Sequence, residues 1–159
     1  MNNSDAQKSE QRLKKMKAKD LMSRFAITIR DEETITTLAH LMMRFKISGV
    51  PVCTKNGDVC GIVTATDLFN VMKKTVQQME DGHAVPDYST IRVTDMMTRD
   101  VVTVTEETSL YEMIKLMCDR NIHTLPVMVL SKKEIVGVIG RRDILNAFYV
   151  GSSSELKSE

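Results

Sequence analysis

Short alternating segments and helical stripes follow one another twice along the chain. Residues 27–29 and 102–104 alternate apolar and polar side chains as β-strands do, and each segment is followed by apolar residues at helical spacing. The predicted buried helix faces comprise Ile35, Leu38, Ala39, Leu41, Met42 and Phe45 in the first stripe and Leu110, Met113, Ile114, Leu116 and Met117 in the second. Ser109, with Glu112 three positions later, forms a capping box that predicts where the second helix starts, and Thr34 can cap the first.

Two apolar strands and a second helix complete each pattern. Residues 50–53 and 59–63 form a predicted hairpin across Asn56–Gly57, a dipeptide that tight turns prefer. A short helix is predicted to open just after Asp67 and, in the second half, just after Asp143. Each half of the chain therefore has the order β-α-β-β-α.

The chain is a tandem duplication. When Asp20 is aligned with Asp95, the segments 20–24 and 47–52 match 95–99 and 122–127, and a single insertion then aligns 61–67 with 137–143. The positions of the first repeat that are identical to their counterparts, up to the end of the first hairpin strand, are Asp20, Met22, Arg24, Thr28, Glu32, Leu41, Met42, Ile47, Pro51 and Val52.

We predict an α+β fold in which the two repeats pack sheet to sheet about a pseudo-two-fold axis, because a unit of about 60 residues is only marginally stable alone. The many methionines then fill core gaps. The predicted segments are an N-terminal arm (1–16), a first domain (17–80), a linker (81–91), a second domain (92–150) and a disordered tail (151–159). The arm is expected to be solvated, although Leu13 and Met16 also allow a short docking helix.

Composition and charge narrow the function. The 159 residues carry 22 Lys+Arg and 21 Asp+Glu, a formal net charge of +1, which disfavours nucleic-acid binding. No apolar run is long enough to span a bilayer, so we expect a cytoplasmic protein without membrane contact. Three cysteines without a CxxC spacing are interpreted as core thiols, and no metal site is expected. No phosphate-binding loop, nucleophile elbow or catalytic carboxylate pair is present, so we predict no enzymatic activity.

Three motifs recur in both repeats and resemble those of CBS (cystathionine-β-synthase) domains. They are the lead-ins Asp-Leu-Met-Ser and Asp-Met-Met-Thr, the strands Ile-Ser-Gly-Val-Pro-Val and Ile-His-Thr-Leu-Pro-Val, and the segments 61–67 and 137–143, which begin with Gly and end with Asp. Residues 17 to 150 resemble a pair of such domains, a Bateman module. The resemblance implies a regulatory module without catalysis that binds adenosine-containing ligands in clefts between the repeats.

Asp67 and Asp143 are the central candidate ligand residues. A carboxylate at a strand-to-helix turn can accept hydrogen bonds from ribose hydroxyls, and the helix N-terminus favours a phosphate. Thr64 could add a hydroxyl on the same side. The alternative is structural, because Asp before a helix is a preferred N-cap. The two roles are compatible.

The resemblance implies two pockets, each completed by the other repeat. Pocket 1 comprises Thr64, Asp67, Val101, Val102, His123, Thr124 and Arg142. Pocket 2 comprises Ala26, Ile27, Ser48, Gly49, Thr66, Gly140 and Asp143. Arg142 suits a phosphate, although Arg141 and Arg142 could equally be a solvated pair, and His123 could be a half-buried strand residue. We expect pocket 2 to be weaker, because Gly140 stands where pocket 1 has Thr64.

The predicted function is a sensor that binds an adenine nucleotide (AMP, ADP or ATP) in the Asp67 pocket and signals occupancy to an unknown regulated protein or to its mate in a homodimer. One alternative is a structural dimerisation or docking module with clefts that bind nothing. A second is a weak binder of nucleic acid or of an acidic partner through the lysines of the N-terminal arm, which are Lys8, Lys14, Lys15, Lys17 and Lys19.

Overall fold

The chain forms two compact units whose boundaries differ from those of the sequence repeats. The structure is a computed structural model that describes the backbone of residues 3–155 and the side chains of residues 6–148. Unit 1 combines the described residues up to Ala26 with those from Val102 onward, and unit 2 comprises Ile27–Val101. The chain therefore passes from one unit to the other after Ala26 and again after Val101.

Unit 2 contains a three-stranded sheet with the strand order β1-β2-β3. Strand β1 pairs in parallel with β2, and β2 pairs antiparallel with β3. The elements of the unit are β1 (Ile29–Arg30), α3 (Ile35–Phe45), β2 (Gly49–Cys53), β3 (Val59–Thr64), α4 (Ala65–Glu80) and the 3-10 helix η1 (Val93–Asp95). The predicted hairpin is confirmed, and Gly57 takes a φ of +89° in its turn, a conformation that favours glycine.

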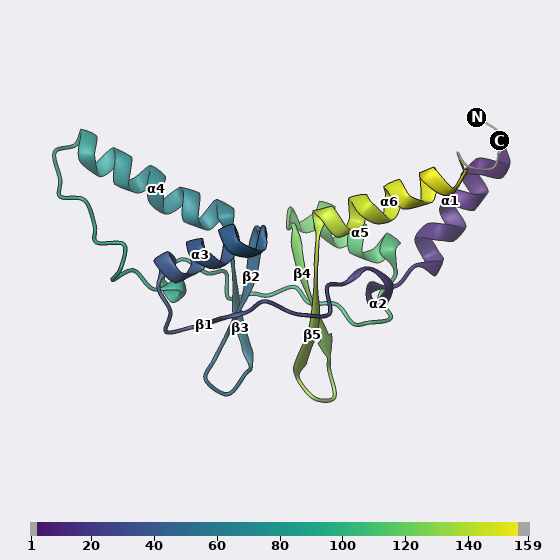
Figure 1. The fold of residues 1–159 in the computed structure, drawn as a ribbon, viewed down its shortest axis with the longest axis horizontal. Coiled ribbons are helices and arrows are strands. Elements are labelled where there is room, and N and C mark those ends of the chain that lie inside the picture. The colour runs from purple at the N-terminus through teal and green to yellow at the C-terminus, as the bar shows by residue number, and fades with distance from the viewer. Residues whose placement is uncertain (1–2, 156–159) are drawn as a thin grey trace. The chain divides into compact units, whose positions relative to one another are not determined.

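Unit 1 contains a two-stranded antiparallel hairpin flanked by helices (Figure 1). Its elements are α1 (Asn3–Lys15), α2 (Ala18–Leu21), α5 (Leu110–Arg120), β4 (Thr124–Val129), β5 (Glu134–Gly140) and α6 (Arg141–Glu155). The strand predicted at residues 102–104 is reduced to a single parallel bridge between Val104 and Val127. Helix α6 extends into the segment expected to be a disordered tail, and the end of that segment lies outside the described residues.

Each unit has its own apolar core, built from one helix stripe and one hairpin. In unit 2, Leu38 of α3 is completely buried with Val50, Val52 and Val63 of the hairpin. The corresponding completely buried residues of unit 1 are Met113, Leu125, Val127 and Ile139. The predicted stripes are thus largely confirmed, but Phe45 at the end of α3 is 43% exposed.

The lead-in segment of each repeat packs on the hairpin of the other repeat. Ser23 forms an antiparallel bridge with Val138, and Thr98 forms the equivalent bridge with Ile62. Beside these bridges, Met22 lies directly over Gly137, and Met97 lies directly over Gly61. This reciprocal exchange explains why unit 1 combines two segments that are far apart in the sequence, and why unit 2 continues past the first repeat to Val101.

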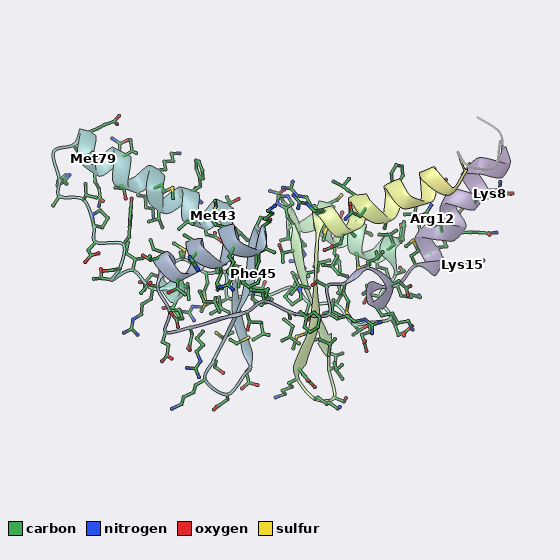
Figure 2. The ribbon with its side chains drawn as sticks, viewed as in Figure 1. Lys8, Arg12, Lys15, Met43, Phe45 and Met79 are labelled. Carbon is green, nitrogen blue, oxygen red and sulfur yellow. The ribbon has the colours of Figure 1, made fainter. Side chains whose placement is uncertain are left out.

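Residues Asn3–Lys15 of the expected N-terminal arm form helix α1, whose C-terminal end docks on unit 1 as the docking alternative predicted, while residues 6–11 are exposed. Leu13 and Met16 pack against the core of unit 1, and the Met16 carbonyl accepts a hydrogen bond of 2.8 Å from the backbone N–H of Leu110. The Arg12 guanidinium donates to the carbonyl of Ala147 in α6 at 2.7 Å. These contacts hold a helix whose exposed side is polar, and Figure 2 shows its exposed cations Lys8 and Lys15.

None of the described helices is both long and apolar enough to cross a bilayer.

Candidate ligand-binding site

The Asp67 carboxylate is built into the start of helix α4. Thr64 is the N-cap residue, and its hydroxyl accepts a hydrogen bond of 3.3 Å from the Asp67 backbone N–H. In return, Asp67 Oδ2 accepts hydrogen bonds from the Thr64 backbone N–H at 2.7 Å and from the Thr64 hydroxyl at 2.8 Å. The pair forms a reciprocal capping box. Oδ1 of Asp67 accepts no hydrogen bond from the residues that the structure describes.

The Asp143 carboxylate occupies the equivalent place at the start of helix α6, with fewer partners. Its Oδ2 accepts a hydrogen bond of 2.7 Å from the Gly140 backbone N–H. Gly140 has no hydroxyl, so the side-chain half of the capping box is absent. Within the described part of the chain, Oδ1 of Asp143 also accepts no hydrogen bond.

Both aspartates therefore lie inside their helices rather than before them. Helices α4 and α6 start at Ala65 and Arg141, ahead of the two aspartates and not just after them as expected. The expectation that Asp67 is itself an N-cap is wrong, because Thr64 holds that position. The spacing Thr-x-x-Asp is a capping-box pattern and could have revealed this arrangement from the sequence.

A backbone hydrogen bond joins each helix start to the residue just before the first strand of the hairpin, β2 or β4. The Ala65 N–H donates to the Ser48 carbonyl at 2.8 Å, and the Arg141 N–H donates to the His123 carbonyl at 3.2 Å. Ser48 and His123 are exposed. The alternative of a half-buried strand residue is therefore wrong for His123, since it precedes β4. Each helix start thus has an exposed Ser or His beside a half-buried carboxylate.

The predicted pocket residues divide between the two units. Unit 2 contains Ile27, Ser48, Gly49, Thr64, Thr66, Asp67 and Val101, and unit 1 contains Ala26, Val102, His123, Thr124, Gly140, Arg142 and Asp143. Within unit 2 the structure brings Thr64, Asp67 and Ser48 together at the start of α4. Within unit 1 it brings Gly140, Asp143 and His123 together at the start of α6. Thr124 and Gly49 are buried, and the assembly of each complete pocket stays a prediction.

Helix α6 starts with two arginines, although a helix N-terminus favours negatively charged side chains. Arg141 and Arg142 are exposed, and neither forms an ion pair with any residue that the structure describes. A helix start carries a partial positive charge, so cations there are unfavourable by some tenths of a kcal/mol each at an exposed site. An anion bound nearby would offset this repulsion.

The cysteines provide no reactive group for chemistry at this site. Burial raises the pKa of the Cys53 thiol and that of the Cys60 thiol above their usual value, so both stay protonated at neutral pH. Cys118 is exposed, so the expectation of a core thiol is wrong there. Among the described residues, no three His, Cys, Asp or Glu side chains gather as metal ligands.

A duplicated α+β unit that carries one carboxylate at the same helix start in both copies defines a class of tandem-repeat folds. The chain belongs to the CBS domain family, because the sequence model of the CBS domain matches residues 18–74 and 93–150. It is a CBS domain pair, a kind of module that is typically regulatory rather than catalytic.

Comparison with individual proteins agrees with this family. A homoserine O-acetyltransferase of Methanosphaera stadtmanae is 29% identical over 136 residues, which are 86% of this chain and 25% of that enzyme. The chain thus spans about a quarter of this relative.

Two solved structures share the fold. A CBS domain pair in complex with 5′-methylthioadenosine and S-adenosyl-L-methionine superposes with a TM-score of 0.70 at 24% identity, over 86% of this chain and 98% of that one. The protein CBSX2 in complex with AMP superposes with a TM-score of 0.68 at 20% identity, over the same shares of the two chains.

Proposed function

We propose that this chain is a regulatory module that binds an adenine nucleotide, with the ribose held by Asp67. The observation that carries the proposal is that only one oxygen of the Asp67 carboxylate accepts hydrogen bonds from the protein. Oδ2 is held by the capping box, whereas Oδ1 accepts no hydrogen bond from the described residues. A carboxylate oxygen in this state accepts strongly from the hydroxyls of a ribose, and a hydrogen bond to a charged group contributes about 1.5–3 kcal/mol.

Similar proteins support an adenosine-containing ligand. Two CBS structures of the same fold were solved with AMP and with S-adenosyl-L-methionine and 5′-methylthioadenosine. These three molecules share the adenosine group, and they differ in the charge attached to its 5′ position. Contacts to ribose and adenine therefore define the class of ligand, and contacts to the 5′ group select among its members.

The exposed arginines favour a phosphate over a sulfonium or a thioether at the 5′ position. Arg142 stands at the start of α6 without an ion pair among the described residues, and a guanidinium binds phosphate through two parallel hydrogen bonds. The adenine would be recognised by backbone groups at Val101 and Val102. Thr124 and His123 complete the proposed set of pocket 1, and Asp143 is the ribose acceptor of a second, weaker pocket.

Titration calorimetry with AMP, ADP and ATP tests the site. We expect Asp67→Ala to abolish binding in pocket 1 and Arg142→Ala to weaken ATP more than adenosine. Asp58→Ala, at an exposed carboxylate of the β2–β3 hairpin, and Arg120→Ala, at the exposed end of α5, are the matched controls. Equal affinity of the wild-type protein and the Asp67 variant would refute the site.

We further propose that the module signals as a homodimer through helices α3 and α4 of unit 2. Large apolar side chains stand exposed on both helices, and Figure 2 shows Met43, Phe45 and Met79. On α4 the exposed apolar residues are Phe69, Met72, Val76 and Met79, at alternating spacings of three and four positions. This is the spacing of a seam between two helices, and it fits a second copy of the same face.

The molecular mass in solution tests the dimer. Phe69 is 73% exposed, so Phe69→Lys should fold normally and lower the mass measured by light scattering to that of a monomer. Leu130→Lys is the matched control, because Leu130 is 70% exposed on the β4–β5 turn of unit 1 and belongs to neither α3 nor α4. A ligand shifts such an assembly only through different affinities for its two states. If the Phe69 variant keeps the wild-type mass, the face has another role.

A docking module without ligand is the second candidate, favoured by the same exposed helices. It predicts that no adenine nucleotide shifts the thermal unfolding midpoint. A ligand at about 100 times its Kd would instead add about 2.7 kcal/mol to the free energy of unfolding. The melting experiment therefore separates the two candidates directly.

A further inference from the structure

The exposed methionines of the described chain lie on one pair of helices. Met43 of α3 and Met72 and Met79 of α4 are exposed, and Figure 2 shows Met43 and Met79. Every other methionine whose side chain the structure describes is buried or half-buried. The contrast is sharpest between neighbours, since Met43 is 80% exposed and Met42 is 7% exposed in the core of unit 2. Accessible thioether sulfur is therefore concentrated on the helices of the proposed dimer seam.

Exposure decides which thioether an oxidant reaches. A peroxide converts methionine to its sulfoxide: a sulfur lone pair attacks one peroxide oxygen, the O–O bond breaks as the S–O bond forms, and the second oxygen leaves as water with both protons. The sulfur is oxidised, and the peroxide is reduced. The sulfoxide is polar, whereas the thioether is apolar. Oxidation of the exposed methionines would thus make the seam polar while the methionines of the two cores stay unchanged.

We propose that Met43, Met72 and Met79 are oxidation sites through which a peroxide weakens the self-association of this chain. This inference rests on the proposed dimer, since it concerns the same two helices. In the dimer, a sulfoxide oxygen in the seam would be buried against apolar side chains without a hydrogen-bond donor. Burying such a polar group weakens association about tenfold. A thiol-dependent methionine sulfoxide reductase returns the thioether, so the change is reversible.

The dimer protects the side chains that oxidation changes. A second copy covers the seam, so a peroxide reaches these sulfur atoms mainly in the dissociated chain. An oxidised chain re-forms the seam poorly, and the association equilibrium therefore shifts toward the monomer. The oxidation rate at the three sites should rise as the protein is diluted. Methionines that are simply exposed in every state would be oxidised at the same rate at all protein concentrations.

Peroxide treatment followed by peptide mass spectrometry and light scattering tests the proposal. A Cys118→Ser background removes an exposed thiol that can cross-link two chains under oxidation. In dilute protein, Met43, Met72 and Met79 should gain oxygen at least about tenfold faster than the buried Met42. The molecular mass should fall to that of a monomer as these sites are oxidised, and reductase with a thiol should restore the original mass.

A leucine variant is the matched control. Leucine keeps the apolar character and approximate volume of methionine without its sulfur, so the combined variant Met43→Leu, Met72→Leu and Met79→Leu should remain a dimer after the same treatment. The single variant Met72→Gln places a polar group in the seam without any oxidant. It should weaken the dimer about tenfold.

The possible failures are distinguishable. A wild-type protein that is monomeric before treatment would overturn the proposed dimer and the oxidation switch with it. A wild-type dimer that keeps its mass after full oxidation of the three methionines would overturn the switch alone. The same holds if the leucine variant dissociates in peroxide as the wild-type protein does, or if the oxidation rate at the three sites does not depend on protein concentration.

Discussion

Adding one methyl group at Gly137 should destabilise unit 1 much more than the same change at Gly61 destabilises unit 2. A Cβ at Gly137 would lie 2.8 Å from the Ser23 carbonyl oxygen and 2.6 Å from Met22 Sδ. At Gly61, the close neighbours are all atoms of the Met97 side chain, with Cγ at 2.9 Å. A flexible side chain can move aside, but the Ser23 backbone is fixed by its bridge to β5.

The loss in the free energy of unfolding depends on which atoms the added methyl group displaces. The bridge between Ser23 and Val138 contains two backbone hydrogen bonds, at 3.1 and 3.3 Å, and a displaced Ser23 strains both. Each such bond contributes about 0.5–1.5 kcal/mol, and overpacking costs about 1–3 kcal/mol. Gly137→Ala should therefore lower the free energy of unfolding by about 2–4 kcal/mol, whereas Gly61→Ala should cost about 1 kcal/mol.

Urea denaturation followed by circular dichroism measures both variants. Met97→Ala in the Gly61→Ala background makes room for the new methyl group, so the two changes together should cost about 1 kcal/mol less than their sum. Met22→Ala should rescue Gly137→Ala only in part, because the Ser23 carbonyl stays in place. Equal losses at the two glycines would refute the assignment of backbone contact at one and side-chain contact at the other.

Two further predictions concern helix ends. Ser109→Ala removes the cap of α5 and should cost about 1 kcal/mol at neutral pH. Hydrogen bonds from the Ser109 hydroxyl and backbone N–H hold the pKa of Glu112 below its usual value of 4.5. This stabilisation is therefore present above that pH and disappears as the pH falls. The difference in the free energy of unfolding between the variant and the wild type, measured in urea, should shrink in acid. Leu13→Ala should lower the free energy of unfolding of unit 1 by about 1–2 kcal/mol, because the Leu13 side chain is partly buried against the core of that unit. A stability equal to that of the wild type would mean that α1 is not docked.

The sequence pattern predicted the elements of each repeat well because those elements form locally. The stripe that includes Leu38 and the hairpin across Gly57 rest on neighbours close in the sequence, and the capping box of Ser109 and Glu112 is confirmed by hydrogen bonds of 2.7 and 2.8 Å. Periodicity and cap spacing report this kind of structure directly.

The exchange of lead-in segments could not be predicted in the same way. Met22 and Met97 occupy equivalent positions in the two repeats, so their own sequence does not say which hairpin each one covers. One signal was available: Gly61 and Gly137 interrupt apolar strands, and a glycine in a strand often marks the close approach of another segment. That signal identifies the contact surface but not the segment that fills it.

Helix α1 was predicted only as an alternative, from the spacing of Leu13 and Met16, for a different reason. Its residues are mostly polar, and a helix that is polar all round is not expected to be stable alone. Its stability comes from tertiary contacts at its C-terminal end, where Arg12 bonds the carbonyl of Ala147 and Met16 bonds the backbone of Leu110. Such contacts leave no period in the sequence.

The role of Asp67 shows how a structural and a functional interpretation of one residue can both hold. From the sequence, helix capping and ribose binding are two compatible interpretations of the same carboxylate. In the structure they involve different atoms, since Oδ2 accepts the two Thr64 hydrogen bonds and Oδ1 accepts none from the described residues. Capping therefore does not consume the binding capacity of the site but orients it. Without a hydroxyl at Gly140, Asp143 Oδ2 accepts one hydrogen bond where Asp67 Oδ2 accepts two, so the side-chain half of the cap is missing at α6.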